Sequence, residues 1–195
     1  MHGTKRRPKL AKAVALQTKK HHHSHWPEWV ISKTMMEKAM KSIAARVHID
    51  RGYDIPYLAG YTRDGQTIFI DRHMPKSFVY RGRRVYTDRF LVVHEAVEKS
   101  LIQLLGLDYL MAHQIALHAE QAAVRAEGIQ WDAYNAFMEK YIKAIGDEKL
   151  DKVPDNLDLT PYVDFHDAAE LKQMRANAVP GPISQPRHAV HIAGL

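Results

Sequence analysis

The stretch LVVHEAVEKSL, residues 91–101, places ionisable side chains inside an otherwise apolar run. A helix turns by about 100° per residue, so His94 and Glu98 would lie one turn apart, on the same face as Leu91 and Leu101. That face is apolar enough to be buried, and a charge buried there without a partner costs several kcal/mol. The stretch therefore predicts an enclosed helix whose His94 and Glu98 meet polar partners from another part of the chain.

A second helix, expected from Asp108 to about Glu127, carries candidate partners. His113 and Glu120 share one face of it with apolar residues, whereas His118 lies on a polar face. Alanines recur beside His113, which permits close approach of a neighbouring helix. We therefore expect His113 and Glu120 to face the first helix and His118 to face water.

The turn between the two helices determines which residues meet. Gly106 is a typical C-terminal residue of a helix, and Glu98 lies eight residues before it while His113 lies seven after it. In an antiparallel helical hairpin, residues equally far from a short turn lie at the same height. His113 should therefore lie opposite Glu98, and Glu120 should come within reach of His94.

Imidazoles and carboxylates that converge in a dry interior match the ligands of a divalent metal ion. Histidine nitrogen and carboxylate oxygen both bind zinc at about 2.0–2.2 Å, and two His plus one Glu with an open position is typical of catalytic zinc. Glu95 points about 100° away from His94, where it could accept a proton from a metal-activated water. The third ligand stays open between His113, His118 and Glu120. The candidate zinc ligands are His94, Glu98, His113 and Glu120.

The segment VVHEAVEKSL resembles the active-site helix of zincin-like metallopeptidases, whose motif is HExxH. Here the motif is HExxE, because Glu98 stands where the second histidine should be. The strand TIFID, residues 67–71, precedes this helix as the edge strand does in zincins, and HAEQAA resembles the segment that carries the third ligand. The similarity covers about residues 55–127.

The resemblance implies a zinc-dependent hydrolase that cleaves a peptide or amide bond. By position, His94 would be the first ligand and Glu95 the general base, with the third ligand at His113 or Glu120. A zinc-activated water would attack the carbonyl carbon, and the TIFID strand would align a peptide or protein substrate.

A purely structural interpretation of the same residues also stays open. His94 and Glu98 could form a buried hydrogen-bonded pair, or Glu98 could pair with Arg84 or Arg89. His113 could be a core histidine bonded to a backbone carbonyl. A chain with 13 His and 22 acidic residues can also produce HExxE by chance.

The remaining pattern predicts an α+β fold, in which a small antiparallel hairpin sheet packs against a mainly helical body. We expect one domain over residues 26–178, with hairpins around the turns at 63–65 and 81–82. Further helices are expected at 32–47, 89–105, 131–145 and 160–174, with Ser32, Asp88 and Thr160 as N-terminal caps.

Composition limits the class of protein. The chain has no cysteine, which excludes disulfides and thiolate metal sites. No apolar run approaches the roughly 20 residues that a membrane span needs, and the basic N-terminus lacks the apolar core of a secretory signal. We therefore expect a soluble, cytoplasmic protein without a membrane span.

The positive charge of the chain is concentrated at one end. Residues 1–25 hold seven Lys and Arg and no acidic residue, whereas the rest of the chain holds 21 basic and 22 acidic residues. This histidine-rich tail has the composition of a disordered segment, and it could also bind nucleic-acid phosphates through Lys5, Arg6, Arg7 and Lys9. An alternative function is therefore that of a non-enzymatic nucleic-acid or assembly-binding accessory protein of phage or mobile-element type. Residues 179–195 are Pro-rich and expected to be extended or disordered.

Overall fold

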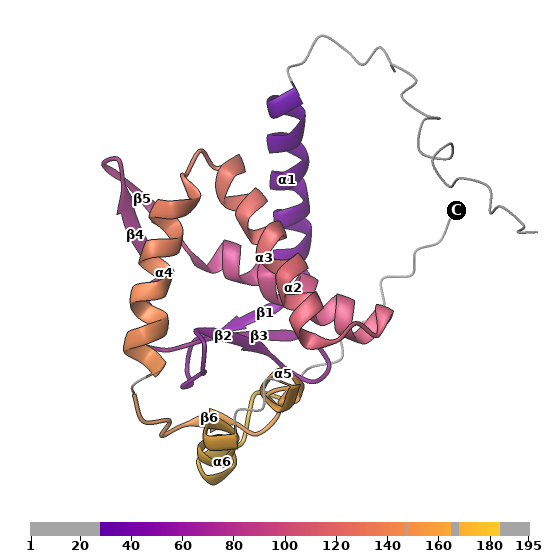
Figure 1. Cartoon of the computed structure of the whole chain (residues 1–195), viewed down its shortest axis with the longest axis vertical. Coiled ribbons are helices and arrows are strands. Elements are labelled where there is room, and N and C mark those ends of the chain that lie inside the picture. The colour runs from indigo at the N-terminus through magenta and orange to yellow at the C-terminus, as the bar shows by residue number, and fades with distance from the viewer. Residues whose placement is uncertain (1–27, 147, 165–167, 184–195) are drawn as a thin grey trace, which may run out of the picture.

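Helices surround a small sheet in the computed structural model, which describes residues 28–146, 148–164 and 168–183 (Figure 1). This arrangement confirms the predicted α+β class. The helices are α1 (Glu28–Ala44), α2 (Asp88–Leu105), α3 (Tyr109–Ala126), α4 (Trp131–Gly146), α5 (Thr160–Asp164) and α6 (Ala168–Ala176). The strands are β1 (His48–Asp50), β2 (Ala59–Tyr61), β3 (Thr67–Ile70), β4 (Ser77–Tyr80), β5 (Arg83–Tyr86), β6 (Val153–Pro154) and β7 (Ala178–Val179).

The main sheet has three strands in the order β1-β3-β2. The hairpin predicted around 63–65 is confirmed, because β2 and β3 are antiparallel with Gly60 opposite Phe69. Gly65 in its turn has a φ of 69°, a conformation that glycine adopts without strain. The sequence did not predict β1, which joins β3 in parallel with Ile49 opposite Ile68. The sheet is therefore mixed rather than a simple antiparallel hairpin.

Strand β3 is buried on both faces. Ile68 and Ile70 belong to the larger core cluster, which contains residues of α2, α3 and α4, while Phe69 belongs to a smaller cluster with Leu157 and Tyr162. Figure 1 shows α2 and α3 on one side of the sheet and α5 and α6 on the other. Strand β3, within the TIFID segment, is therefore the central strand, as an ordinary interior strand would be, and not the edge strand that the zincin resemblance implied.

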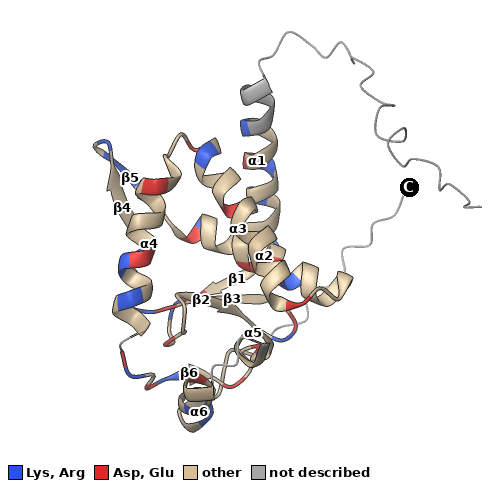
Figure 2. Ribbon diagram, viewed as in Figure 1, with Lys and Arg blue, Asp and Glu red and all other residues tan. Residues whose placement is uncertain are grey.

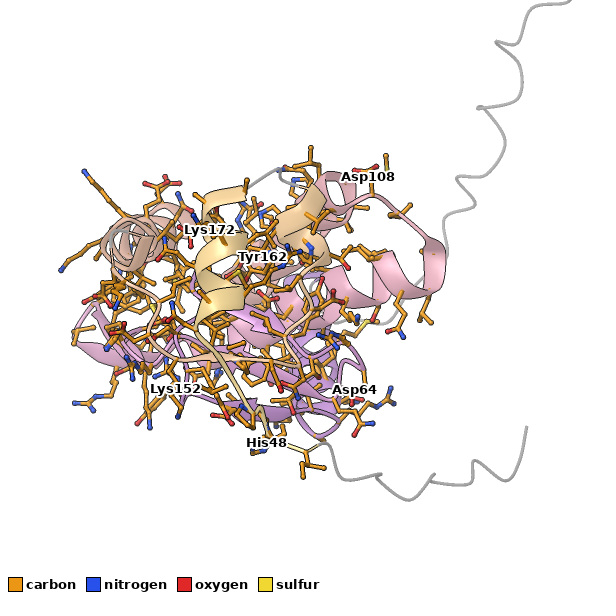
Figure 3. All side chains as sticks on the ribbon, turned by 90° about the horizontal axis from the view of Figure 1, so that it is seen from below. His48, Asp64, Asp108, Lys152, Tyr162 and Lys172 are labelled. Carbon is orange, nitrogen blue, oxygen red and sulfur yellow. The ribbon has the colours of Figure 1, made fainter. Side chains whose placement is uncertain are left out.

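The antiparallel hairpin of α2 and α3 is held by specific residues at its turn. Gly106 ends α2 in the left-handed conformation, with a φ of 64°, as predicted. The side chain of Asp108 caps α3 by accepting a hydrogen bond from the backbone nitrogen of Met111 at 3.0 Å. Figure 3 shows Asp108 at the outer end of this turn. The turn thus sets the relative height of the two helices.

Three predicted N-terminal caps are wrong. Helix α1 begins four residues before Ser32, and α2 begins at Asp88 itself after Thr87, whose hydroxyl donates to the carbonyl of Pro75 rather than capping the helix. At α5 the nitrogen of Thr160 donates to Asp158, so Asp158 is the capping side chain. The helix expected over 160–174 is divided into α5 and α6, and residues 165–167 between them lie outside the described residues.

Several other predictions concern the ends of the chain. The basic tail at 1–25 lies outside the described residues, as do 184–195 of the Pro-rich segment. Within that segment, Val179 ends β7, which pairs in parallel with β6. In the part of the chain that the structure describes, no helix combines the length and apolar character needed to cross a membrane.

We expect replacement of Asp108 by alanine to lower the free energy of unfolding by about 1 kcal/mol, because the nitrogen of Met111 loses its capping acceptor. Urea unfolding followed by circular dichroism measures the change. Asp132→Ala, in the first turn of α4, is a matched control that removes a helix-dipole partner but no capping bond. An equal loss in the two variants would contradict the assignment of Asp108 as a cap.

Candidate metal centre

The ionisable residues of α2 and α3 meet in the interior, as the helical periodicity predicted. His94, Glu98 and Glu120 are 6%, 4% and 4% exposed, and the His113 side chain remains 35% exposed. His118 is exposed on the other side of α3, as expected. The inward and outward assignments of these residues are therefore confirmed.

Three side-chain atoms from the two helices converge on one point. The Nε2 atom of His94 lies 3.1 Å from Nδ1 of His113, and that Nδ1 lies 2.9 Å from Oε2 of Glu98. The third distance, from Nε2 of His94 to Oε2 of Glu98, is 3.5 Å. These three residues form a grouping that could hold a metal ion. We call this set, His94, Glu98 and His113, the ligand triangle.

Glu120 lies on the opposite side of the His94 ring from the ligand triangle. Its Oε2 is 2.9 Å from Nδ1 of His94, and its Oε1 accepts a hydrogen bond of 2.6 Å from the hydroxyl of Tyr134. A carboxylate at Nδ1 favours the tautomer that leaves the Nε2 lone pair free toward the triangle. Of the four predicted ligands, three thus converge, and the fourth orients His94.

Glu98 is fixed from the sheet. The hydroxyl of Tyr61 on β2 donates to Oε1 of Glu98 at 3.0 Å, which leaves Oε2 for the ligand triangle. Sequence reasoning missed both Tyr61 and Tyr134. Each lies in an expected strand or helix, but nothing in the sequence indicates which helix those elements meet.

Burial and hydrogen bonding have opposite effects on the pKa values of Glu98 and His94. Burial disfavours the charged forms of both residues, but hydrogen bonds from His113 and His94 outweigh it for Glu98 and lower its pKa to about 2. Hydrogen bonds to Glu120 and Glu98 likewise outweigh burial for His94 and raise its pKa to about 10. The cluster therefore holds a positive charge at the triangle, either as a proton on His94 or as a cation that replaces it.

Glu95 lies apart from the ligand triangle but lines the same pocket. Burial, and then the negative charge of Glu98, raise the pKa of Glu95 to about 8. The pocket has a cavity volume of about 140 Å³. Its walls include Tyr162 of α5, which lies near the middle of the molecule in Figure 3. Most of the other lining residues are aromatic or apolar: Leu58, Leu91, Tyr109, Leu117, Trp131 and Met138.

The edge strand nearest the ligand triangle is β2, which supplies Tyr61. Its outer side is already engaged, since the nitrogen of Asp158 donates to the carbonyl of Tyr61 at 2.8 Å and Thr62 forms an antiparallel bridge with Leu157. A peptide therefore cannot pair with β2 at Tyr61 while the 157–158 segment stays in place.

Among the described residues, Glu98 forms no ion pair with Arg84 or Arg89; its charged partners are His94 and His113. Arg89 pairs with Glu127 at 2.5 Å rather than with Glu98. A second grouping of possible metal ligands, Asp54, Asp71 and His73, has its buried carboxylates occupied by the backbone. Asp54 accepts hydrogen bonds from the nitrogens of Asp151 and Lys152, and Asp71 accepts from those of Ile55 and His73.

Comparison with models of protein families, with curated proteins and with solved structures found no match to this chain.

We expect the metal-free protein to lose stability as the pH rises from about 6.5 to about 10. The folded state holds the proton on His94 after the unfolded chain, with a pKa near 6.5, has released it. The raised pKa of Glu95 acts in the same sense from pH 4.5 to about 8. Urea unfolding across this range measures how steeply the free energy of unfolding falls with pH. Glu95→Gln should make that fall shallower below pH 8. A stability that rises with pH in metal-free protein would contradict this ionisation scheme.

We expect Tyr134→Phe to weaken binding of Co²⁺ or Zn²⁺ by about tenfold, because residues that orient a metal ligand typically contribute that much. Competition with a chelator measures the affinity, in protein whose histidines at 21–25 are replaced. Tyr141→Phe, which removes a hydroxyl elsewhere on α4, is the matched control. Unchanged affinity in Tyr134→Phe would show that Glu120 does not need this hydroxyl to orient His94.

Proposed function

We propose that this protein is a zinc-dependent hydrolase of a peptide or amide bond, with the ligand triangle as its metal site. The observation that carries the proposal is the mutual distance of the three ligand atoms: 2.9, 3.1 and 3.5 Å. Tetrahedral zinc with bonds of about 2.0–2.1 Å separates its ligand atoms by about 3.3 Å. The triangle thus has dimensions close to one face of a zinc tetrahedron, and zinc bound there would keep its fourth position for water or substrate.

The donor set supports a catalytic rather than a purely structural site. Two imidazoles and one carboxylate leave an open position, and His113 on the second helix restores the two-His, one-Glu total that the HExxE motif alone lacks. When bound, the cation supplies Lewis acidity, which lowers the pKa of water and polarises a carbonyl. Glu120 and Tyr61 hold two of the ligands in place through hydrogen bonds of 2.9 and 3.0 Å.

Glu95 fits the role of general base. Burial and Glu98 raise its pKa to about 8, so its carboxylate is a stronger proton acceptor than an ordinary one. A cation at the ligand triangle would lower that pKa toward the neutral range, where the deprotonated form is present. The carboxylate would take a proton from the attacking water as its oxygen bonds to the carbonyl carbon. It would then deliver that proton to the leaving nitrogen as the carbon–nitrogen bond breaks.

The pocket supplies the remaining requirements of the reaction. Burial raises the pKa of the Tyr109 phenol above its usual value, so this side chain stays protonated and can donate a hydrogen bond to the developing oxyanion. The apolar walls exclude water around the reacting bond. Because β2 is engaged by the 157–158 segment, the substrate enters this pocket rather than extending the sheet.

The metal content of the purified protein tests the site. We expect about one zinc per chain by elemental analysis when the histidines at 21–25 are replaced by serine, since that run could bind metal independently. His94→Ala or His113→Ala should remove the zinc, while His118→Ala, on the exposed side of α3, should keep it. Equal zinc content in all three variants would contradict the assignment of the ligand triangle.

The role of Glu95 requires a separate test with metal-loaded protein. Glu95→Gln should keep the zinc and lower the rate of hydrolysis of an unbiased peptide library at least about 100-fold, as expected for loss of a general base. Mass spectrometry of the products measures the rate. A variant that keeps both zinc and wild-type activity would refute this mechanism, and zinc binding without activity in the wild type would leave a metal-binding protein and refute the hydrolase.

A further inference from the structure

The β4–β5 hairpin projects from the body of the protein beside α4 (Figure 1). Its strands are antiparallel, with Tyr80 opposite Arg83, and Arg81 and Gly82 form the turn with positive φ values of 48° and 76°. Two left-handed residues in a two-residue turn match the twist of the strands. Figure 2 shows basic residues at the tip.

The two faces of the hairpin have different environments. On the inner face, Phe78 stacks on Phe137 of α4 at 4.8 Å between ring centroids, and the hydroxyl of Tyr80 accepts from the nitrogen of Gln130. The outer face has no such cover: Val79 is 72% exposed and Tyr86 is 55% exposed. Arg84, opposite Val79 in the register, is also exposed. The hairpin is therefore anchored on one side and free on the other.

Positive charge is concentrated around this hairpin. Residues 72–89 contain six of the 21 Lys and Arg residues that follow residue 25, but one of the 22 Asp and Glu residues. Some of this charge is engaged: Arg72 pairs with Asp54, Arg89 pairs with Glu127, and Arg83 donates to the Glu127 carbonyl. Asp88, the acidic residue within 72–89, pairs with Arg51.

Among the described residues, no ion pair joins Arg81 or Arg84 to a carboxylate. The Arg81 guanidinium lies over the ring of Tyr80, 5.2 Å from its centroid, a contact that leaves its charge unpaired by any carboxylate. The charge of Arg81 at the turn and of Arg84 on the outer face is thus available to an external anion.

We propose that the outer face of the β4–β5 hairpin binds duplex DNA, with Arg81 and Arg84 contacting phosphates. A two-stranded ribbon fits the major groove, which is about 12 Å wide, since its strands lie about 4.8 Å apart. A single exposed aromatic side chain, Tyr86, does not make the series of stacking platforms that single strands require. Val79 and Tyr86 also offer too little apolar surface for stable insertion into a membrane. This surface is separate from the ligand triangle and does not depend on the proposed hydrolase activity.

Fluorescence anisotropy with a 20-base-pair duplex, between 50 and 200 mM salt, tests the proposal on the full chain. We expect Arg81→Ser with Arg84→Ser to weaken binding at least about tenfold at 50 mM salt. The slope of log affinity against log salt should fall by about two, because two phosphate contacts are lost. The basic tail is present in every variant, so its contribution stays constant.

Two control variants separate a specific surface from loss of charge or of fold. Lys172→Ser with Arg175→Ser removes the same charge from α6, far from the hairpin (Figure 1), and should leave the slope near its wild-type value. Arg81→Lys with Arg84→Lys keeps the charge and should also keep the slope. An equal loss in the α6 variant, or no loss in the hairpin variant, would overturn the proposal. Tighter binding to single-stranded DNA of the same length or to anionic lipid vesicles would overturn it as well.

Discussion

The fold of this protein depends on burying His94, Glu98 and Glu120 between α2 and α3 with hydrogen-bond partners for each. His94 contacts Glu120 through one ring nitrogen, and His113 and Glu98 through the other. An ionised group left alone at this depth would cost several kcal/mol, whereas a complete hydrogen-bonded network offsets that cost. The close packing of the two helices and the convergence of these polar groups therefore require one another.

The rest of the molecule completes this network from outside the helical hairpin. The sheet brings Tyr61 to Glu98, and α4 brings Tyr134 to Glu120, so each carboxylate has a partner on the side away from the histidines. Strand β3 makes this possible because its alternating side chains join two core clusters, which fixes the sheet between the ligand helices and the C-terminal segments. That same burial removes β3 from the edge, and the 157–158 segment engages β2. An active site on this scaffold would consequently receive its substrate in the aromatic pocket rather than as an added strand.

The fold separates two regions of opposite electrostatic character, the buried ligand triangle and the exposed β4–β5 hairpin. Around the ligand triangle, carboxylates are concentrated and favour a proton or a cation, which is the physical basis of the candidate metal site. At the β4–β5 hairpin, Arg81 and Arg84 form no ion pair with a carboxylate of the described residues and favour an anion. Phe78 of β4 packs against Phe137 and Tyr134 of α4, and Tyr134 also donates a hydrogen bond to Glu120. The ligand triangle and the hairpin therefore both contact α4, directly or through Glu120, although their electrostatic character differs.

Local sequence patterns were enough to predict the helical hairpin, the two β-hairpins and the inward direction of His94, Glu98, His113 and Glu120. These follow from local rules: a period of 3.6 residues, a glycine at the end of a helix, and turn residues between strands. The packing of distant segments was needed to show that β1 joins β3 and that TIFID is central. It was also needed to show that Glu120 contacts the far side of His94 while His113 completes the triangle. Those features depend on contacts between segments far apart in the chain. Residue spacing shows which side chains share a helix face, but it does not show whether a carboxylate on that face binds a metal ion or accepts a hydrogen bond from a histidine. Tyr61 and Tyr134 were missed for the same reason, since a strand or helix pattern shows which face is buried but not what it is buried against.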